Sequence, residues 1–263
     1  MVFLPVIIFV LGLLIGSFLN VVILRMHTGR SFVKGKSICP RCGRKLRWFE
    51  LVPVVSFLAL RGRCRTCHEH ISFQYPIVEL LTGFLFVLFY IKAPLAGGFS
   101  AFSWAWFVFM ATIASVLIVI TVYDIRHKII PDGAVYTFIL LALISVVYHV
   151  ITGGIALIFP LLIAGVVVAL PFFLIWFFSK GKFMGFGDVK LALGMGWLLG
   201  LSQGFTAVIF GFWIGGIFGL FLIALSHRYS MKSEIPLAPF LIAGLSIVGI
   251  FGITLSSLFP LWH

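Results

Sequence analysis

Charged residues are scarce in this sequence, and acidic ones are the scarcest. Only 10% of the 263 residues are charged, whereas soluble domains average about 25%. Hydrophobic residues make up 62% of the chain, which excludes both a soluble globule and an intrinsically disordered chain. Any chemistry that needs a carboxylate must use one of seven acids: Glu50, Glu69, Glu79, Asp124, Asp132, Asp188 and Glu234.

Basic residues are more common, with 19 Lys and Arg against the seven acids and a formal net charge of +12. Such an excess is typical of nucleic-acid-binding proteins. It is also typical of membrane proteins, whose cytoplasmic loops are rich in Lys and Arg. Because the rest of the chain is so apolar, we favour a membrane protein and expect no nucleic-acid partner.

Long uncharged stretches predict an all-α membrane protein, a polytopic bundle of about eight transmembrane helices. A span needs about 20 apolar residues, and residues 1–24 contain no charge. Basic residues follow this stretch rather than precede it, so we interpret it as a retained helix and not as a cleaved signal peptide. The other spans are expected at about 76–91 and 103–123, two within 133–179 separated at 152–154, two within 191–227 separated at 202–204, and one at 236–258.

The basic residues also orient the predicted bundle. Eleven Lys and Arg lie between residues 25 and 65, and with eight spans every later one except Lys92 falls on the same side. By the positive-inside rule that side is cytoplasmic, so both termini are expected outside. The expected division is a first helix at 1–24, a cytoplasmic domain at 25–75 and a polytopic membrane domain at 76–263.

A glycine stripe is present in the seventh predicted span. Gly211, Gly215 and Gly219 recur every four residues, which is the small-residue spacing that lets two membrane helices approach closely. We therefore expect this stripe to pack against a neighbouring helix.

All four cysteines lie in the predicted cytoplasmic loop, as two C-x2-C pairs with 21 residues between them. The pairs are Cys39 with Cys42 and Cys64 with Cys67. This arrangement is typical of a tetrahedral zinc site, whereas disulfides are rare in the reducing cytoplasm and a redox role lacks the surrounding βαβ pattern. Four thiolates close the coordination shell, so we expect a structural Zn²⁺ and place His68 and His70 in solvent.

Two aspartates are expected at the cytoplasmic ends of helices. Asp124 ends the third predicted span, and Asp188 opens the sixth, directly after Gly185 and Gly187. Ionisable residues at such depth are functional candidates. Two adjoining carboxyl groups share one proton, so that one can act as general base on a water and the other as general acid, as in an aspartyl protease. The structural alternatives are an ion pair of Asp124 with Lys128 and an N-cap role for Asp188.

The glycines before Asp188 favour the catalytic interpretation, because they would let the backbone pass close to a substrate strand.

The remaining acids are less distinctive. Asp132 stands in an Ile-Pro-Asp-Gly turn signature, and Glu50, Glu69 and Glu234 are expected on solvated faces. Glu79, at the mouth of the second span, fits a buried pairing with loop Lys or Arg and a functional role equally well.

In this order along the chain, these motifs resemble the type IV prepilin peptidase family, which are bacterial bifunctional enzymes of the GxGD aspartyl protease class. The resemblance covers nearly the whole chain and is carried by Gly16-Ser-Phe-Leu-Asn20, the two cysteine pairs, Tyr75-Pro-Ile-Val-Glu79 and Gly185-Phe-Gly187-Asp188. It implies cleavage of the leader from type IV prepilins and pseudopilins at the cytoplasmic face of the bacterial inner membrane. It also implies N-methylation of the new N-terminal residue with S-adenosylmethionine as donor.

The resemblance further assigns roles to individual residues. It implies that Asp124 and Asp188 are the catalytic aspartates and that the cysteine loop supports methylation. Gly62 and Glu79 are the methyltransferase candidates it indicates, and Gln74 departs from the basic residue more usual before the Tyr-Pro pair. A Rossmann-type donor site is not expected, because no G-x-G-x-x-G loop is present.

Two alternatives remain at this point. A proton-coupled transporter or channel would use the two aspartates as a proton relay, although such proteins place coupling groups near the membrane midplane and often have repeated halves. A membrane assembly factor would use the zinc loop to dock partners and would not need the aspartates. The sequence indicates no oligomeric state.

Overall fold

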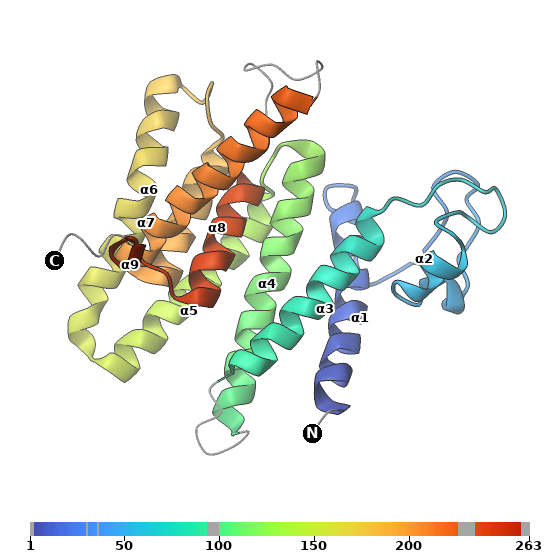
Figure 1. Ribbon diagram of the computed structural model, residues 1–263, viewed down its shortest axis with the longest axis horizontal. Coiled ribbons are helices and arrows are strands. Elements are labelled where there is room, and N and C mark those ends of the chain that lie inside the picture. Colours follow the sequence, from blue (N-terminus) through green and yellow to red (C-terminus); the bar gives the residue numbers. More distant parts are fainter. Residues whose placement is uncertain (1–2, 30, 36, 94–99, 226–234, 259–263) are drawn as a thin grey trace. The chain divides into compact units, whose positions relative to one another are not determined.

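The computed structural model describes residues 3–29, 31–35, 37–93, 100–225 and 235–258, and these are almost entirely helical (Figure 1). The described part contains no strand, only two isolated β-bridges. The chain divides into two compact units, residues 1–119 and 120–263, with the boundary inside helix α4 (Ala101–His127). The predicted all-α class is therefore confirmed.

The first unit contains α1 (Phe3–Arg25), α3 (Gln74–Lys92) and the first part of α4. Glycines let α1 and α3 pack closely: a Cβ atom at Gly12 would overlap the backbone of Gly83. Ile8, Phe86 and Phe107 then form a buried apolar cluster between the three helices. The loop between α1 and α3 carries the cysteines, with a short 3₁₀ helix η1 (Trp48–Leu51) and a short helix α2 (Val55–Ala59).

The second unit contains the end of α4 and the helices that follow it. These are α5 (Asp132–Gly153), η2 (Ile155–Leu157), α6 (Ile158–Ser179), α7 (Phe186–Leu225), α8 (Ala238–Phe251) and α9 (Leu255–Leu258). Helix α7 packs against α5, α6 and α8. Gly211 and Gly215 face Leu241 and Phe240 of α8, so the predicted packing against a neighbouring helix is confirmed for two of the three stripe glycines, whereas Gly219 faces Ile235, which precedes α8.

Within the described ranges, six helices are long and apolar enough to cross a membrane, which agrees with the predicted membrane class, but eight separate spans are not confirmed. The break predicted at 152–154 is present, because Gly154 adopts φ 101°. Residues 191–225 belong to one 40-residue element, α7, whose kink lies at Gly200 (φ 77°, ψ −177°) and not at 202–204. This conformation is essentially restricted to glycine, which explains where the helix bends.

The last predicted span, 236–258, is also shorter than expected. Helix α8 has 14 residues and ends at Phe251, and the following Gly252 adopts the left-handed conformation favoured at helix C-termini. A transmembrane helix needs about 20 residues, so α8 alone is too short to cross a bilayer. The predictions for Glu234 and for the basic residues Arg228 and Lys232 fall on 226–234, outside the described residues.

Candidate active site and metal centre

The four cysteines come together, as their spacing predicts. Their sulfur atoms all lie within 4.8 Å of one another, and Cys39 Sγ is 3.8 Å from Cys67 Sγ. Zinc–sulfur bonds of about 2.3 Å in a tetrahedron place the sulfurs about 3.8 Å apart. A disulfide would need about 2.05 Å, and all four cysteines are free thiols. The donor set therefore has the geometry of a tetrahedral metal site.

The two C-x2-C pairs are built by the same backbone pattern. The N–H of Gly43 donates to the carbonyl of Cys39 at 3.0 Å, and the N–H of His68 donates to the carbonyl of Cys64 at 3.0 Å. Both donors have positive φ, 67° at Gly43 and 55° at His68. The sequence indicates the first reversal through its glycine, whereas the second gives no such signal because histidine rarely adopts this conformation.

The ionisation of the thiols also suits a bound cation. Backbone N–H groups of Cys67 and Thr66 lower the pKa of Cys64 to about 6. The N–H of Glu69 lowers the pKa of Cys67, but burial and the neighbouring thiols outweigh it and raise the pKa to about 11. The pKa of Cys39 is also lowered, so Cys39 and Cys64 form thiolates more easily than an ordinary cysteine, whereas ionisation of Cys67 is opposed unless a cation compensates the charge. Cysteine ligands bind metals as thiolates, so the cluster fits a divalent cation.

Glu50 is a buried carboxylate that links several residues of the cysteine loop. Its side chain is buried and accepts two hydrogen bonds from Arg44, at 2.6 and 3.0 Å, and one from the N–H of Arg47 at 2.8 Å. The Arg44 guanidinium is the main reason why the pKa of Glu50 is lowered. The prediction of a solvated Glu50 is wrong, because a bidentate arginine six residues earlier compensates its burial. Glu69 is partly exposed and pairs with Arg41.

Asp124 and Asp188 meet within the second unit. Asp124 is buried in the last turn of α4, whereas Asp188 is half-buried in the first turn of α7, and their charges interact. The N–H of Ala238, the first residue of α8, lies near the Asp124 carboxyl, and the N–H of Gly185 lies near that of Asp188. The ends of α4, α7 and α8 therefore surround this carboxyl pair. Ala238 carries no functional group, so the sequence offers no signal for its role.

Two contacts fix the start of α7 against the connection between α4 and α5. A Cβ atom at Gly187 would overlap Ile130, so this glycine is needed for close packing inside the protein. Lys190 Nζ forms an ion pair with Asp132 at 2.6 Å, which joins the first turns of α7 and α5. Gly185, by contrast, faces open space apart from the Asp188 carboxylate.

Glu79 is buried at the start of α3, and its carboxylate accepts the N–H of Val54 at 2.8 Å. This contact with a backbone group differs from the expected pairing with a loop Lys or Arg. Val54 has φ 59° and ψ −50°, and the N–H of Val55 donates to the carbonyl of Pro53 at 2.5 Å, which makes a γ-turn. Positive φ is rare and strained for a β-branched residue, so Glu79 holds an unfavourable turn in place.

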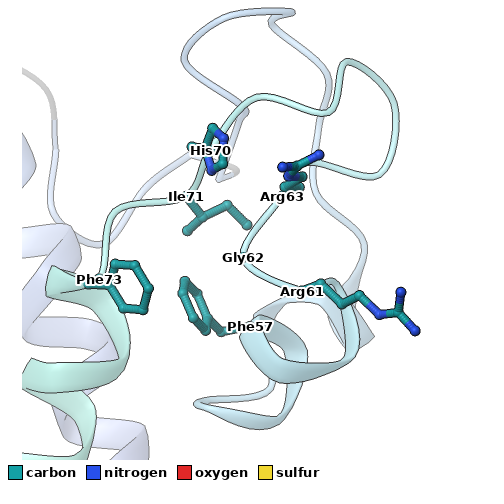
Figure 2. A pocket seen from close by; sticks show the side chains of 7 residues that line it. All are labelled: Phe57, Arg61, Gly62, Arg63, His70, Ile71 and Phe73. Atoms are coloured by element: carbon teal, nitrogen blue, oxygen red, sulfur yellow. The ribbon is translucent and has the colours of Figure 1, made fainter.

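Gly62 lies at a pocket of about 340 Å³ in the cysteine loop (Figure 2). It adopts φ 66°, and a Cβ atom there would press on the ring of Phe57 in α2. Because Val54 immediately precedes α2, this helix connects Glu79 to the pocket wall beside Gly62. The two methyltransferase candidates are therefore linked through α2.

Comparison with known proteins gives two matches to family models. Residues 10–93 match the bacterial peptidase A24 N-terminal domain, and residues 111–220 match the type IV leader peptidase family. No solved structure shows a significant match.

Several relatives align over most of the chain. The prepilin leader peptidase/N-methyltransferase of Bacillus subtilis is 31% identical, over 96% of this chain and 96% of its own length. The protein of the same name from Myxococcus xanthus is 34% identical over 87% of this chain, which spans only 66% of that relative. The type 4 prepilin-like proteins leader peptide-processing enzyme of Escherichia coli is 32% identical, over 97% of this chain and 95% of its own length. With such identity over nearly whole chains, this protein belongs to the type IV leader peptidase family.

Proposed function

We propose that the protein is a membrane aspartyl endopeptidase that removes the leader peptide from type IV prepilins and pseudopilins and N-methylates the new N-terminal residue. The names of its relatives support this reaction pair, and none supports a transporter or an assembly factor. The observation that best supports the peptidase activity is that Asp124 and Asp188, at the ends of two helices, lie near enough for their charges to interact.

In the proposed cleavage, the two carboxyl groups share one proton, because both do not ionise at short range. The ionised member takes a proton from a water, whose oxygen attacks the scissile carbonyl carbon. The protonated member first donates towards the carbonyl oxygen. When the carbon–nitrogen bond breaks, the leaving amine takes up a proton from the pair. The half-buried Asp188 would meet substrate and water, while Asp124 is buried near the N–H of Ala238.

The location of the reaction belongs to the same proposal. We place the carboxyl pair and the cysteine loop at the cytoplasmic face of the bacterial inner membrane, with both termini periplasmic. The clustering of basic residues between 25 and 65 supports this orientation. We further propose a division into a first transmembrane helix at 1–24, a zinc-binding domain at 25–75 and a membrane peptidase domain at 76–263.

The proposed cofactor of the loop is a structural Zn²⁺ bound by Cys39, Cys42, Cys64 and Cys67. When bound, it would cross-link the two halves of the loop, because each half supplies two of the ligands. Its role would be structural, because a closed four-thiolate shell leaves no position for substrate. The methyl donor is proposed to be S-adenosylmethionine, whose methyl group passes to the new α-amine as the amine loses a proton. Gly62 and Glu79 remain the candidates for supporting this step.

The peptidase half is tested by co-expressing the chain with a prepilin-like substrate and measuring leader removal by mass. Asp124→Asn and Asp188→Asn should each abolish cleavage, because an amide cannot exchange the shared proton. Glu69→Gln removes a carboxylate that is partly exposed in the loop and should cleave like wild type. Normal cleavage by both aspartate variants would overturn the proposal.

A further inference from the structure

The pocket beside Gly62 combines cations with an apolar wall. Arg61, Arg63 and His70 line it together with Phe57, Ile71 and Phe73. Figure 2 shows His70 and Arg63 above the two phenyl rings, while the side chain of Arg61 lies level with Phe57 and extends away from the rings. The ring centroids of Phe57 and Phe73 are 5.3 Å apart. A volume of about 340 Å³ suits a small group or the head of a larger molecule.

The acids near this pocket already have other partners. Between residues 37 and 93 the only acids are Glu50, which binds Arg44, Glu69, which pairs with Arg41, and Glu79, which holds the N–H of Val54. Among the residues that the structure describes, Arg61 and Arg63 therefore have no acidic partner. Their charge favours an anionic ligand.

The surface next to the pocket is apolar and exposed. Its large side chains are Trp48 (80% exposed), Val55 (61%), Leu58 (68%) and Phe73 (71%). Single exposed apolar residues are common in proteins, but such a group on one short helix and its neighbours marks an interaction surface. Phe73 directly precedes α3, where the apolar surface continues with Ile77, also exposed.

The contact between Glu79 and Val54 fixes the depth of this surface. Helix α3 has 19 residues, about the number that a bilayer requires, so its first residue Gln74 belongs at the membrane boundary. Glu79 lies five residues further, about 7.5 Å along the helix axis. Because Val54 binds Glu79 directly, α2 begins at this depth. Interfacial helices bury their apolar face about 5–10 Å into the boundary between head groups and acyl chains.

We infer that α2 and the residues around it lie in the membrane interface, and that the pocket with Arg61, Arg63 and His70 binds the phosphate of an anionic phospholipid. The apolar wall distinguishes this ligand from a free anion, since acyl chains can continue from Phe73 along α3. The lipid would hold the cysteine loop against the bilayer, independently of either enzymatic reaction.

The anion site is tested on the full-length protein in nanodiscs of phosphatidylcholine with increasing amounts of phosphatidylglycerol. Hydrogen exchange of the backbone amides at 55–73 should slow as phosphatidylglycerol is added. In Arg61→Gln/Arg63→Gln the amount needed should rise roughly tenfold or more, because each basic residue near an anionic surface contributes to its attraction. The control Lys34→Gln/Lys45→Gln removes the same charge from exposed positions of the same loop. In this control the amount of phosphatidylglycerol needed for protection should rise far less.

An equal shift in both double variants would overturn the specific site, since general attraction to the surface would then suffice. Protection by S-adenosylmethionine in pure phosphatidylcholine, without an effect of phosphatidylglycerol, would also overturn it and assign the pocket to the methyl donor. If circular dichroism shows that the arginine double variant is unfolded, Arg61→Gln alone carries the test.

The depth is tested by quenching Trp48 with phospholipids brominated along their acyl chains. The contribution of Trp48 is the difference between the emission of wild type and that of Trp48→Phe. We expect quenching by lipids brominated near the head group. If Trp48 is instead quenched only by a water-soluble quencher, the interfacial position is wrong.

Discussion

The cysteine cluster and the aspartate pair are assembled in different ways. Each half of the cysteine cluster is a turn of a few residues, closed by its own backbone hydrogen bonds. The two aspartates lie 188 − 124 = 64 positions apart and depend on how α4, α7 and α8 pack. We therefore expect the cysteine cluster to tolerate changes in the bundle, while the aspartate pair should fail when a distant packing contact is altered.

The largest effect expected from a packing change is at Gly187. Gly187→Ala should lower kcat/KM for leader cleavage about a hundredfold, since its Cβ atom would displace the start of α7 from Ile130, and shifts of about 1 Å in catalytic groups have such costs. The metal content of the loop should stay unchanged. Gly185→Ala is the matched control, because that position faces open space, and it should lose much less. Equal losses would assign both glycines to substrate contact.

The reverse experiment removes the metal and leaves the bundle intact. Replacement of Cys64 and Cys67 by Ser should release nearly all bound metal, as measured by elemental analysis of the purified protein. Methylation should fall more than leader cleavage, because the cluster and the aspartate pair are assembled separately. If cleavage falls to the same extent, the loop supports the whole fold and the contrast between the two sites is wrong.

Within the loop, a buried and an exposed ion pair can be compared directly. Glu50→Gln should destabilise the loop by about 3 kcal/mol, since it leaves Arg44 without its buried partner. Glu69→Gln breaks the pair with the exposed Arg41 and should cost less than about 1 kcal/mol. The rate at which a chelator removes the metal reports the difference. Equal rates would show that Glu50 does not brace the loop.

How much of each site the sequence predicts follows from this contrast. The cysteine cluster was predictable because its ligands are paired three residues apart, and the break at Gly154 because glycines interrupt an apolar run. The burial of Glu50 was missed, since nothing in its own neighbourhood marks Arg44 as a bidentate partner. The pair of Asp132 with Lys190, 58 positions away, depends on helix packing that no local pattern encodes.

The smallest predicted effect concerns Glu79, which belongs to a helix but acts on the loop. Glu79→Ala should weaken methylation by the equivalent of about 1–2 kcal/mol, because the strained turn at Val54 loses the acceptor that holds it. Leader cleavage, measured on the same protein, should change little.

A second substitution decides how Glu79 acts. Glycine adopts positive φ without strain, so Val54→Gly in the Glu79→Ala background should restore part of the methylation. Glu79→Gln keeps a carbonyl acceptor for the N–H of Val54 and should be nearly as active as wild type. If Glu79→Gln is as impaired as Glu79→Ala and Val54→Gly restores nothing, the charge of Glu79 is required. Glu79 would then act on the reaction itself and not through the turn that carries α2.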